Sequence, residues 1–148
     1  MIYTGKIYHA SLTANLTEIT PHVSRSYKSL EQVVFGSPIQ EMSASSLFRD
    51  SDIYVTRINN GTDISKLKLE ILIKNKNTNF NIPFHIYEIE NNGFHTLPNR
   101  ETKLAELVCS KSCKVLHDFT YPSWFNYMKS SKRVTITDEI ITLFYNKH

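Results

Sequence analysis

The side chains with the most reactive chemistry in this chain are two cysteines, Cys109 and Cys113, and the nearby His117. Thiolates and imidazoles bind zinc, but a tetrahedral site needs further ligands, and His117 is the only other candidate close by. We therefore expect no bound metal. If both cysteines lie on one strand, their spacing of four residues holds them about 13 Å apart at ~3.3 Å per residue. That is too far for a disulfide, so free thiols in a reducing compartment are expected.

The short motifs that usually indicate catalysis or phosphate binding are missing from the sequence. It contains no GxGxxG, Walker loop, HExxH, GxSxG or CxxC. The formal net charge is +3, and the lysines and arginines are dispersed among acidic residues. Such a balance permits a polyanionic ligand but does not by itself require a nucleic-acid or membrane surface.

Three segments follow one another in an order that resembles one known family. Tyr8-His9-Ala10-Ser11 is similar to the Tyr-His-Gly-Thr or His-Gly-Ser strand of the ADP-ribosyltransferase-like superfamily. Val33-Val34-Phe35-Gly36-Ser37-Pro38 resembles its second signature, and Glu106-Leu107-Val108 resembles the third, in which a glutamate opens a late strand. The superfamily includes poly(ADP-ribose) polymerases, rifampin ADP-ribosyltransferases and tRNA 2′-phosphotransferases. The block from Phe84 to Leu116 also looks like the late half of small bacterial and phage relatives.

This resemblance implies NAD as the substrate and cleavage of its nicotinamide N-glycosidic bond through an oxocarbenium-like state, without hydride transfer or a metal. In that chemistry His9 and Ser11 would hydrogen-bond the nicotinamide ribose. Phe35 would hold the departing ring against its π-face, and Ser37 belongs with it among the NAD-binding residues. Glu106 would be the catalytic carboxylate, which binds the ribose 2′-hydroxyl and stabilises the developing positive charge.

Other charged residues could complete such a site. Arg25, Lys28 or Arg57 could meet the pyrophosphate of NAD or of an ADP-ribose-like nucleotide. Glu88 and Glu101 stay open as alternative carboxylates. The sequence does not indicate whether a protein or a nucleic acid is the acceptor. An RNA-end or nucleotide-processing enzyme resembling the 2′-phosphotransferases is a further class, but the several basic positions of those enzymes are not evident.

Departures from the family pattern favour a second class of function. Ala10 replaces a glycine, Phe35 stands where many members have tyrosine, and Leu104 lies where protein-modifying members often carry Gln or Glu. These changes favour a non-catalytic nucleotide-binding or protein-interaction protein, such as a regulatory protein, on the same fold. In structural terms His9 could be a polar strand end, Phe35 a core residue and Glu106 an exposed strand residue.

The densest aromatic cluster lies in the last third of the chain. Together with nearby lysines and an arginine, this cluster has the composition of a surface on which nucleic-acid bases stack. A helix that packs on a sheet explains these aromatic residues better. The cluster comprises Tyr121, Trp124, Phe125 and Tyr127, with Lys129, Lys132 and Arg133 beside it.

A small α+β fold is expected to position these side chains. The chain has 148 residues, of which 41% are hydrophobic and 21% charged, and this suits one globular domain spanning residues 1–148. Regular βαβ alternation is missing, and the resemblance implies split antiparallel or mixed sheets with about three flanking helices. Alternating or β-branched runs predict strands at 6–9, 33–36, 53–58, 82–89, 106–109 and 114–117, and a strand or short helix at 67–71.

Three helices are predicted from caps and apolar periodicity. Ser37-Pro38 supplies an N-cap and an N1 proline for a helix that runs to about Phe48. Pro122-Ser123 caps a helix from Trp124 to Met128. A final helix begins near residue 137 or 138, with an apolar stripe of Ile136, Ile140, Ile141 and Phe144.

The apolar segments of the chain are short. None approaches the roughly 18 to 20 apolar residues that a transmembrane helix needs, and the first residues lack a long apolar run. Two cysteines are too few for the disulfide framework of a small secreted domain. We therefore expect a cytoplasmic protein without a membrane partner.

Overall fold

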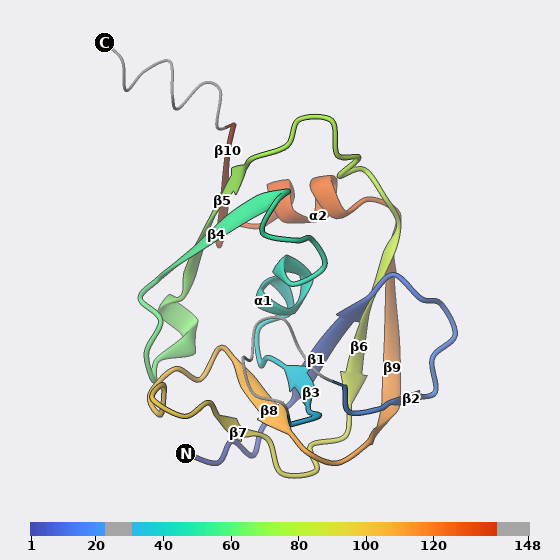
Figure 1. Cartoon of the computed structure of the whole chain (residues 1–148), viewed down its shortest axis with the longest axis vertical. Helices are drawn as coiled ribbons and strands as arrows, with labels where there is room; N and C mark the ends of the chain where they lie inside the picture. The colour runs from blue at the N-terminus through green and yellow to red at the C-terminus, as the bar shows by residue number, and fades with distance from the viewer. Residues whose placement is uncertain (23–30, 139–148) are drawn as a thin grey trace.

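Three small β-sheets and two α-helices form the part of the chain that the structure, a computed structural model, describes, residues 1–22 and 31–138 (Figure 1). The helices are α1 (Gln40–Ser45) and α2 (Trp124–Ser130), with a short 3₁₀ helix, η1, at Ile64–Lys66. The strands are β1 (Ile7–Ser11), β2 (Glu18–Ile19), β3 (Val34–Gly36), β4 (Ile53–Ile58), β5 (Lys68–Ile73), β6 (Phe84–Ile89), β7 (His95–Thr96), β8 (Leu107–Cys109), β9 (Cys113–Tyr121) and β10 (Val134–Asp138). The predicted α+β class is confirmed.

The strands are ordered β1-β6-β9-β2, β10-β5-β4 and β3-β8-β7 in the three sheets. Neighbouring strands are antiparallel, except that β10 pairs with β5 in parallel. In Figure 1, β1, β6 and β9 lie on the right and β4, β5 and β10 on the upper left, with α1 between the two groups and β3 and β8 below it. All the predicted strands are confirmed, and the ambiguous segment at 67–71 belongs to strand β5.

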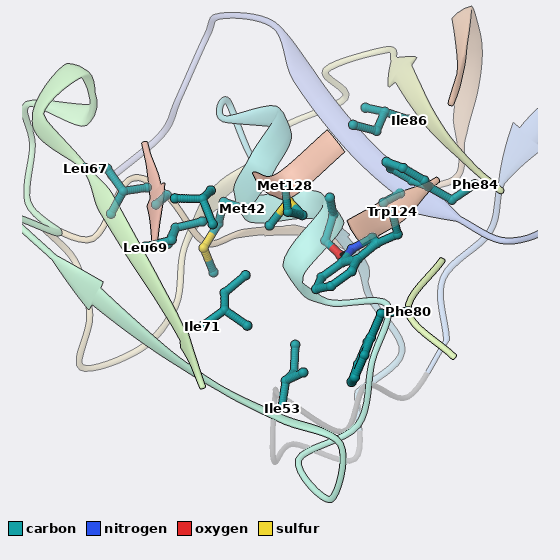
Figure 2. Close-up of a cluster of buried hydrophobic side chains, with 14 residues drawn as sticks. Met42, Ile53, Leu67, Leu69, Ile71, Phe80, Phe84, Ile86, Trp124 and Met128 are labelled. Atoms are coloured by element: carbon teal, nitrogen blue, oxygen red, sulfur yellow. Dashed lines mark hydrogen bonds between the residues drawn. The ribbon is translucent and has the colours of Figure 1, made fainter. Parts of the chain in front are cut away.

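The main hydrophobic core lies where α1 and α2 pack between the first two sheets (Figure 2). Trp124 is completely buried, and its indole N–H donates to the carbonyl of Ala44 at 2.9 Å, which ties α2 to α1. Phe48 and Phe80 contact the same indole ring, with centroid separations of 4.6 and 5.8 Å. Tyr127 of α2 also contacts Phe84 of β6, with a centroid separation of 5.3 Å, so the prediction of a helix packed on a sheet is confirmed for α2, whereas Tyr121 ends strand β9. The partly buried rings around this core include Tyr121, Phe125 and Tyr127.

A second core joins β1 to the sheet of β3 and β8. Ile7, Val34, Phe94 and Leu107 are completely buried in it. Just beyond this cluster, Tyr8 and Ser37 form an antiparallel bridge, in which each backbone N–H donates to the carbonyl of the other residue at 2.8 and 3.0 Å. The first two segments of the family resemblance are thus joined directly.

The first helix begins later and ends earlier than the capping pattern predicts. Its N-cap is Ile39, because both backbone groups of Ser37 are already bonded to Tyr8. The Ser37 hydroxyl instead accepts the N–H of Ile39 at 3.0 Å and makes the turn into the helix. The second helix is confirmed, since the Ser123 hydroxyl caps it by accepting the N–H of Asn126 at 3.1 Å.

The prediction of a third helix is wrong for the part of it that lies within the described residues. Residues 134–138 form β10, in which Ile136 pairs with Ile71 of β5. β-Branched residues suit a strand, and the exposed edge of β5 supplies the pairing partner, so tertiary pairing decides the outcome. The predicted stripe residues Ile140, Ile141 and Phe144 lie outside the described residues. Within the ranges described, no helix is long and apolar enough to cross a bilayer.

The two cysteines are free, as predicted, and the structure shows that both are buried and lie on different strands. Cys109 ends β8 and Cys113 opens β9, because the chain reverses between them, so the expected long separation along one strand does not apply. Burial, followed by the effect of the neighbouring Cys109 thiol, raises the pKa of Cys113. The Cys113 thiol is therefore suited to packing rather than to nucleophilic chemistry.

Gly36 supplies a stability test of the junction between β1 and β3. A Cβ at this position would overlap the Ile7 side chain and approach Phe94 to 3.0 Å, and both neighbours are completely buried. We expect Gly36→Ala to lower the free energy of unfolding in urea by about 1–3 kcal/mol, the usual cost of overpacking. The matched Gly61→Ala places its Cβ in open space and should change stability by less than about 0.5 kcal/mol. Equal effects of the two changes would contradict the tight packing.

Candidate functional site

A cavity of about 510 Å³ opens between β1, β3, α1 and β4. Its walls include four of the five residues that the sequence singled out: His9, Phe35, Ser37 and Glu106. They come from three segments far apart in the chain. Ser11 does not line it; its hydroxyl lies at the end of β1 and accepts the N–H of Thr13 at 3.1 Å, where it closes a turn.

His9 is oriented by the strand beside it. Its Nδ1 lies 2.7 Å from the carbonyl oxygen of Phe35, and since a carbonyl can only accept, Nδ1 carries the proton and Nε2 is left as an acceptor. Burial lowers the pKa of His9, and the nearby charge of His22 lowers it further, against the opposing effect of the Phe35 carbonyl. The imidazole is therefore a neutral ring whose free nitrogen can accept a hydroxyl of a ligand.

Phe35 is both a packed residue of a small hydrophobic cluster and part of the cavity wall. It packs against a small cluster of Val33, Leu97 and Val108, and it also lines the cavity. Phe35 pairs with Val108 and Gly36 with Leu107, so the turn into β8 lies beside the end of β3. This register brings Glu106, just before β8, to the same cavity.

Glu106 is buried, so the expectation that it could be an exposed strand residue is wrong. Its side chain is 7% exposed and forms two ion pairs, Oε1 with Nη2 of Arg57 at 2.8 Å and Oε2 with Nη1 of Arg100 at 2.9 Å. Each carboxylate oxygen has two acceptor positions, and the ion pairs use one on each oxygen. The two guanidinium groups hold the carboxylate in one orientation at the wall of the cavity.

The alternative carboxylates do not reach the cavity. Glu88 is buried on β6 and lies 3.9 Å from Lys6, and Glu101 accepts the N–H of Asn99 at 3.2 Å in an exposed turn. Of the three glutamates considered from the sequence, only Glu106 lines the cavity.

The rest of the cavity wall was missed by the sequence analysis, apart from Arg57. Tyr54, with 60% of its surface exposed, offers an aromatic ring, while Arg49, Asp50 and Lys74 bring charges. The Lys74 ammonium donates to the Asp50 carbonyl at 2.7 Å. No local signal identifies these residues, because the position of β4 against β1 and β3 was not predictable. Arg25 and Lys28, the other predicted pyrophosphate partners, lie outside the described residues.

Neither a cluster of metal ligands among the described residues nor a similarity to known proteins adds to this description of the site. The described ranges contain no group of three or more His, Cys, Asp or Glu side chains placed to hold a metal ion. Comparison of the chain with protein-family models, with curated proteins and with solved structures found no match.

The pKa of His9 predicts a pH dependence of stability. As the pH falls through about 6.5 the unfolded chain takes up a proton at this histidine, whereas the folded chain does so only at its lower pKa. The contribution is complete above about pH 6.5 and is lost below it, toward the folded-state pKa. In urea unfolding, we expect the stability advantage of wild type over His9→Asn to shrink from about pH 7.5 to 5 and to stay constant from about pH 7.5 to 8.5. An advantage that grows on acidification would refute a neutral His9.

The two arginines of Glu106 should contribute unequally. The Arg57 side chain is 30% exposed and that of Arg100 is 54% exposed, so solvent screens the second ion pair more strongly. A double-mutant cycle with Glu106→Gln and Arg57→Leu should give a coupling free energy of about 1–3 kcal/mol. The matched cycle with Arg100→Leu should give less than about 1 kcal/mol. A larger coupling to Arg100, measured by urea unfolding, would contradict this order.

Proposed function

We propose that this chain has an ADP-ribosyltransferase-like fold and is an NAD-dependent enzyme that cleaves the bond between nicotinamide and ribose and transfers ADP-ribose. One observation carries the proposal: His9, Phe35, Ser37 and Glu106, chosen from the sequence alone, line one cavity. The volume of about 510 Å³ is within the range of roughly 300 to 1,000 Å³ that is usual for small-molecule and cofactor sites.

The chemistry assigns a role to each side chain. Nε2 of His9 accepts a ribose hydroxyl, and the free acceptor positions of Glu106 take the 2′-hydroxyl of the nicotinamide ribose. The ring of Phe35 lies against the nicotinamide. As the C1′–N bond breaks, its electron pair leaves on nicotinamide, and the fixed carboxylate stabilises the positive charge on the ribose.

The cavity also carries cations for the pyrophosphate of NAD. Arg49 and Lys74 lie toward Ile53, at the first residue of β4, and Arg57 lies at its far end. Ile53 and Arg57 are four positions apart, so the two ends lie about 13 Å apart at ~3.3 Å per residue. The two phosphates of NAD are adjacent and suit the end with Arg49 and Lys74, because the charge of Arg57 at the other end is paired with Glu106.

A second candidate, a non-catalytic nucleotide-binding or regulatory protein on the same fold, is favoured by a specific observation. Arg57 and Arg100 engage both oxygens of Glu106, so their positive charge offsets the field that would stabilise an oxocarbenium ion. Phe35 also lacks the hydroxyl of the tyrosine that many family members carry. In this candidate the cavity binds NAD or ADP-ribose without cleaving either.

We also propose that the protein resides in the cytoplasm. NAD is an intracellular substrate, and Cys109 and Cys113 are free thiols in the structure. Reduced cysteines are typical of cytosolic proteins.

Nicotinamide release from NAD tests the catalytic proposal. We expect wild type to release nicotinamide and Glu106→Gln to do so about 10²- to 10³-fold more slowly, since one preorganised group is lost from the transition state. His9→Ala should bind ADP-ribose more weakly in a thermal-shift titration. The matched Glu101→Gln changes a carboxylate that does not reach the cavity and should behave as wild type.

The possible outcomes separate the two candidates. Stabilisation of wild type by ADP-ribose without nicotinamide release would support the non-catalytic protein and reject the enzyme. Neither stabilisation nor release would reject both. Saturation at 100 times the Kd should raise the free energy of unfolding by about 2.7 kcal/mol, which is readily measured.

A further inference from the structure

A second hollow of about 310 Å³ adjoins the candidate site on the outer side of Glu106. Both hollows are lined by Tyr54, Val55, Arg57 and Glu106, so they meet at the carboxylate. The remaining walls of the second hollow are Thr56, Asn60, Arg100 and Lys103.

The second hollow is positively charged. Three cations, Arg57, Arg100 and Lys103, line it together with one carboxylate, Glu106, which leaves two positive charges in excess. Arg100 and Lys103 are close in the sequence, whereas Arg57 is distant and is brought to them by the fold. Because Glu106 already holds both guanidinium groups at 2.8 and 2.9 Å, their orientation is set before an anion enters.

The backbone of the turn before β8 explains this gathering. The N–H of Arg100 donates to Leu97 at 3.0 Å, that of Lys103 to Arg100 at 3.0 Å, and that of Glu106 to Lys103 at 3.4 Å. These are three successive turns, each closed by a bond that spans three residues, and Arg100, Lys103 and Glu106 at their ends all line the hollow. An ordered turn costs less conformational entropy on ligand binding than a flexible loop.

Two buried polar atoms of this wall lack a hydrogen-bond partner among the described residues. They are Nε of Arg57, a donor, and Oδ1 of Asn60, an acceptor. Unpaired buried polar atoms are rare, and a bound ion, water or ligand can supply the missing partner. The dianionic oxygens of a phosphate ester can accept from Arg57 but cannot donate to Asn60, which needs a donor such as a hydroxyl or an amine. A phosphorylated ribose presents both groups.

We propose that the second hollow binds the phosphorylated ribose of an acceptor, either a free nucleotide or the end of a nucleic acid. Binding depends only on the hollow, whereas the acceptor role rests on the proposed NAD cleavage. In that role an acceptor hydroxyl oxygen forms a bond to C1′ of the NAD ribose. The C1′–N bond breaks with its electron pair leaving on nicotinamide, and the hydroxyl proton passes to water.

Calorimetric titration with ribose 5-phosphate, in the absence of NAD, tests the binding. Lys103→Gln should weaken binding about tenfold, as expected for loss of a charged hydrogen bond, and leaves both partners of Glu106 in place. The matched Lys111→Gln removes the same charge from the exposed turn between β8 and β9 and should bind as wild type. Asn60→Ala should weaken the binding of ribose 5-phosphate more than that of sulfate, because sulfate carries no hydroxyl at neutral pH and only the sugar donates to Oδ1. No binding by wild type, or equal losses in the two lysine variants, would overturn the proposal.

Two further titrations test whether ADP-ribose competes for the second hollow and whether the bound group belongs to a free nucleotide or to a nucleic-acid end. With saturating ADP-ribose present, the affinity for ribose 5-phosphate should stay within about threefold of its value without ADP-ribose, since the ligands occupy different hollows. Mutually exclusive binding would overturn the second site and assign its cations to the binding of NAD. A 5′-phosphorylated oligouridylate that binds more tightly than uridine monophosphate supports a nucleic-acid end, and equal affinities support a free nucleotide. Binding of ribose 5-phosphate without nicotinamide release would support the second hollow as a phosphate-binding site and would reject only the proposed cleavage of NAD.

Discussion

The buried carboxylate of Glu106 is the constraint on which the described architecture of the site depends. An ionised carboxylate that is removed from water needs charged or hydrogen-bonding partners, and two guanidinium groups supply them here. Arg57 comes from β4, in the sheet with β5 and β10, whereas Glu106 introduces β8, in the sheet with β3. The ion pair therefore joins two sheets that share no strand. It also makes the wall that the cavity and the second hollow have in common.

The opposite wall is made by backbone contacts rather than charge. Tyr8 and Ser37 are bridged through their main chains, and the His9 ring is held by the carbonyl of Phe35. Gly36 permits this approach, because any side chain there would meet Ile7 and Phe94. One wall is thus set by close packing and the other by electrostatics. Between them lies a cavity that is lined by both polar and aromatic side chains.

Local pattern predicted the elements of this fold well where one physical preference dominated. β1, β3, β4, β6, β8 and β9 follow from alternation and β-branching, and α2 from its serine cap. Prediction failed where tertiary contacts compete with local preference. The bridge to Tyr8 occupies the backbone groups of Ser37 and moves the start of α1, and the edge of β5 recruits residues 134–138 as a strand. Of the candidate site, Ser11 was misplaced, because its hydroxyl serves a local turn.

By itself the sequence determined the α+β class, most strands, the free thiols and the four residues that share the cavity. These depend on residue types and short-range spacing, which local stereochemistry translates directly into strands and turns. The tertiary structure alone decided that Glu106 is held by Arg57 and Arg100 and that Tyr54, Arg49 and Lys74 complete the cavity. It also decided that a second basic hollow adjoins the cavity. Sheet packing sets these contacts between distant residues, and no local period records which edges will meet.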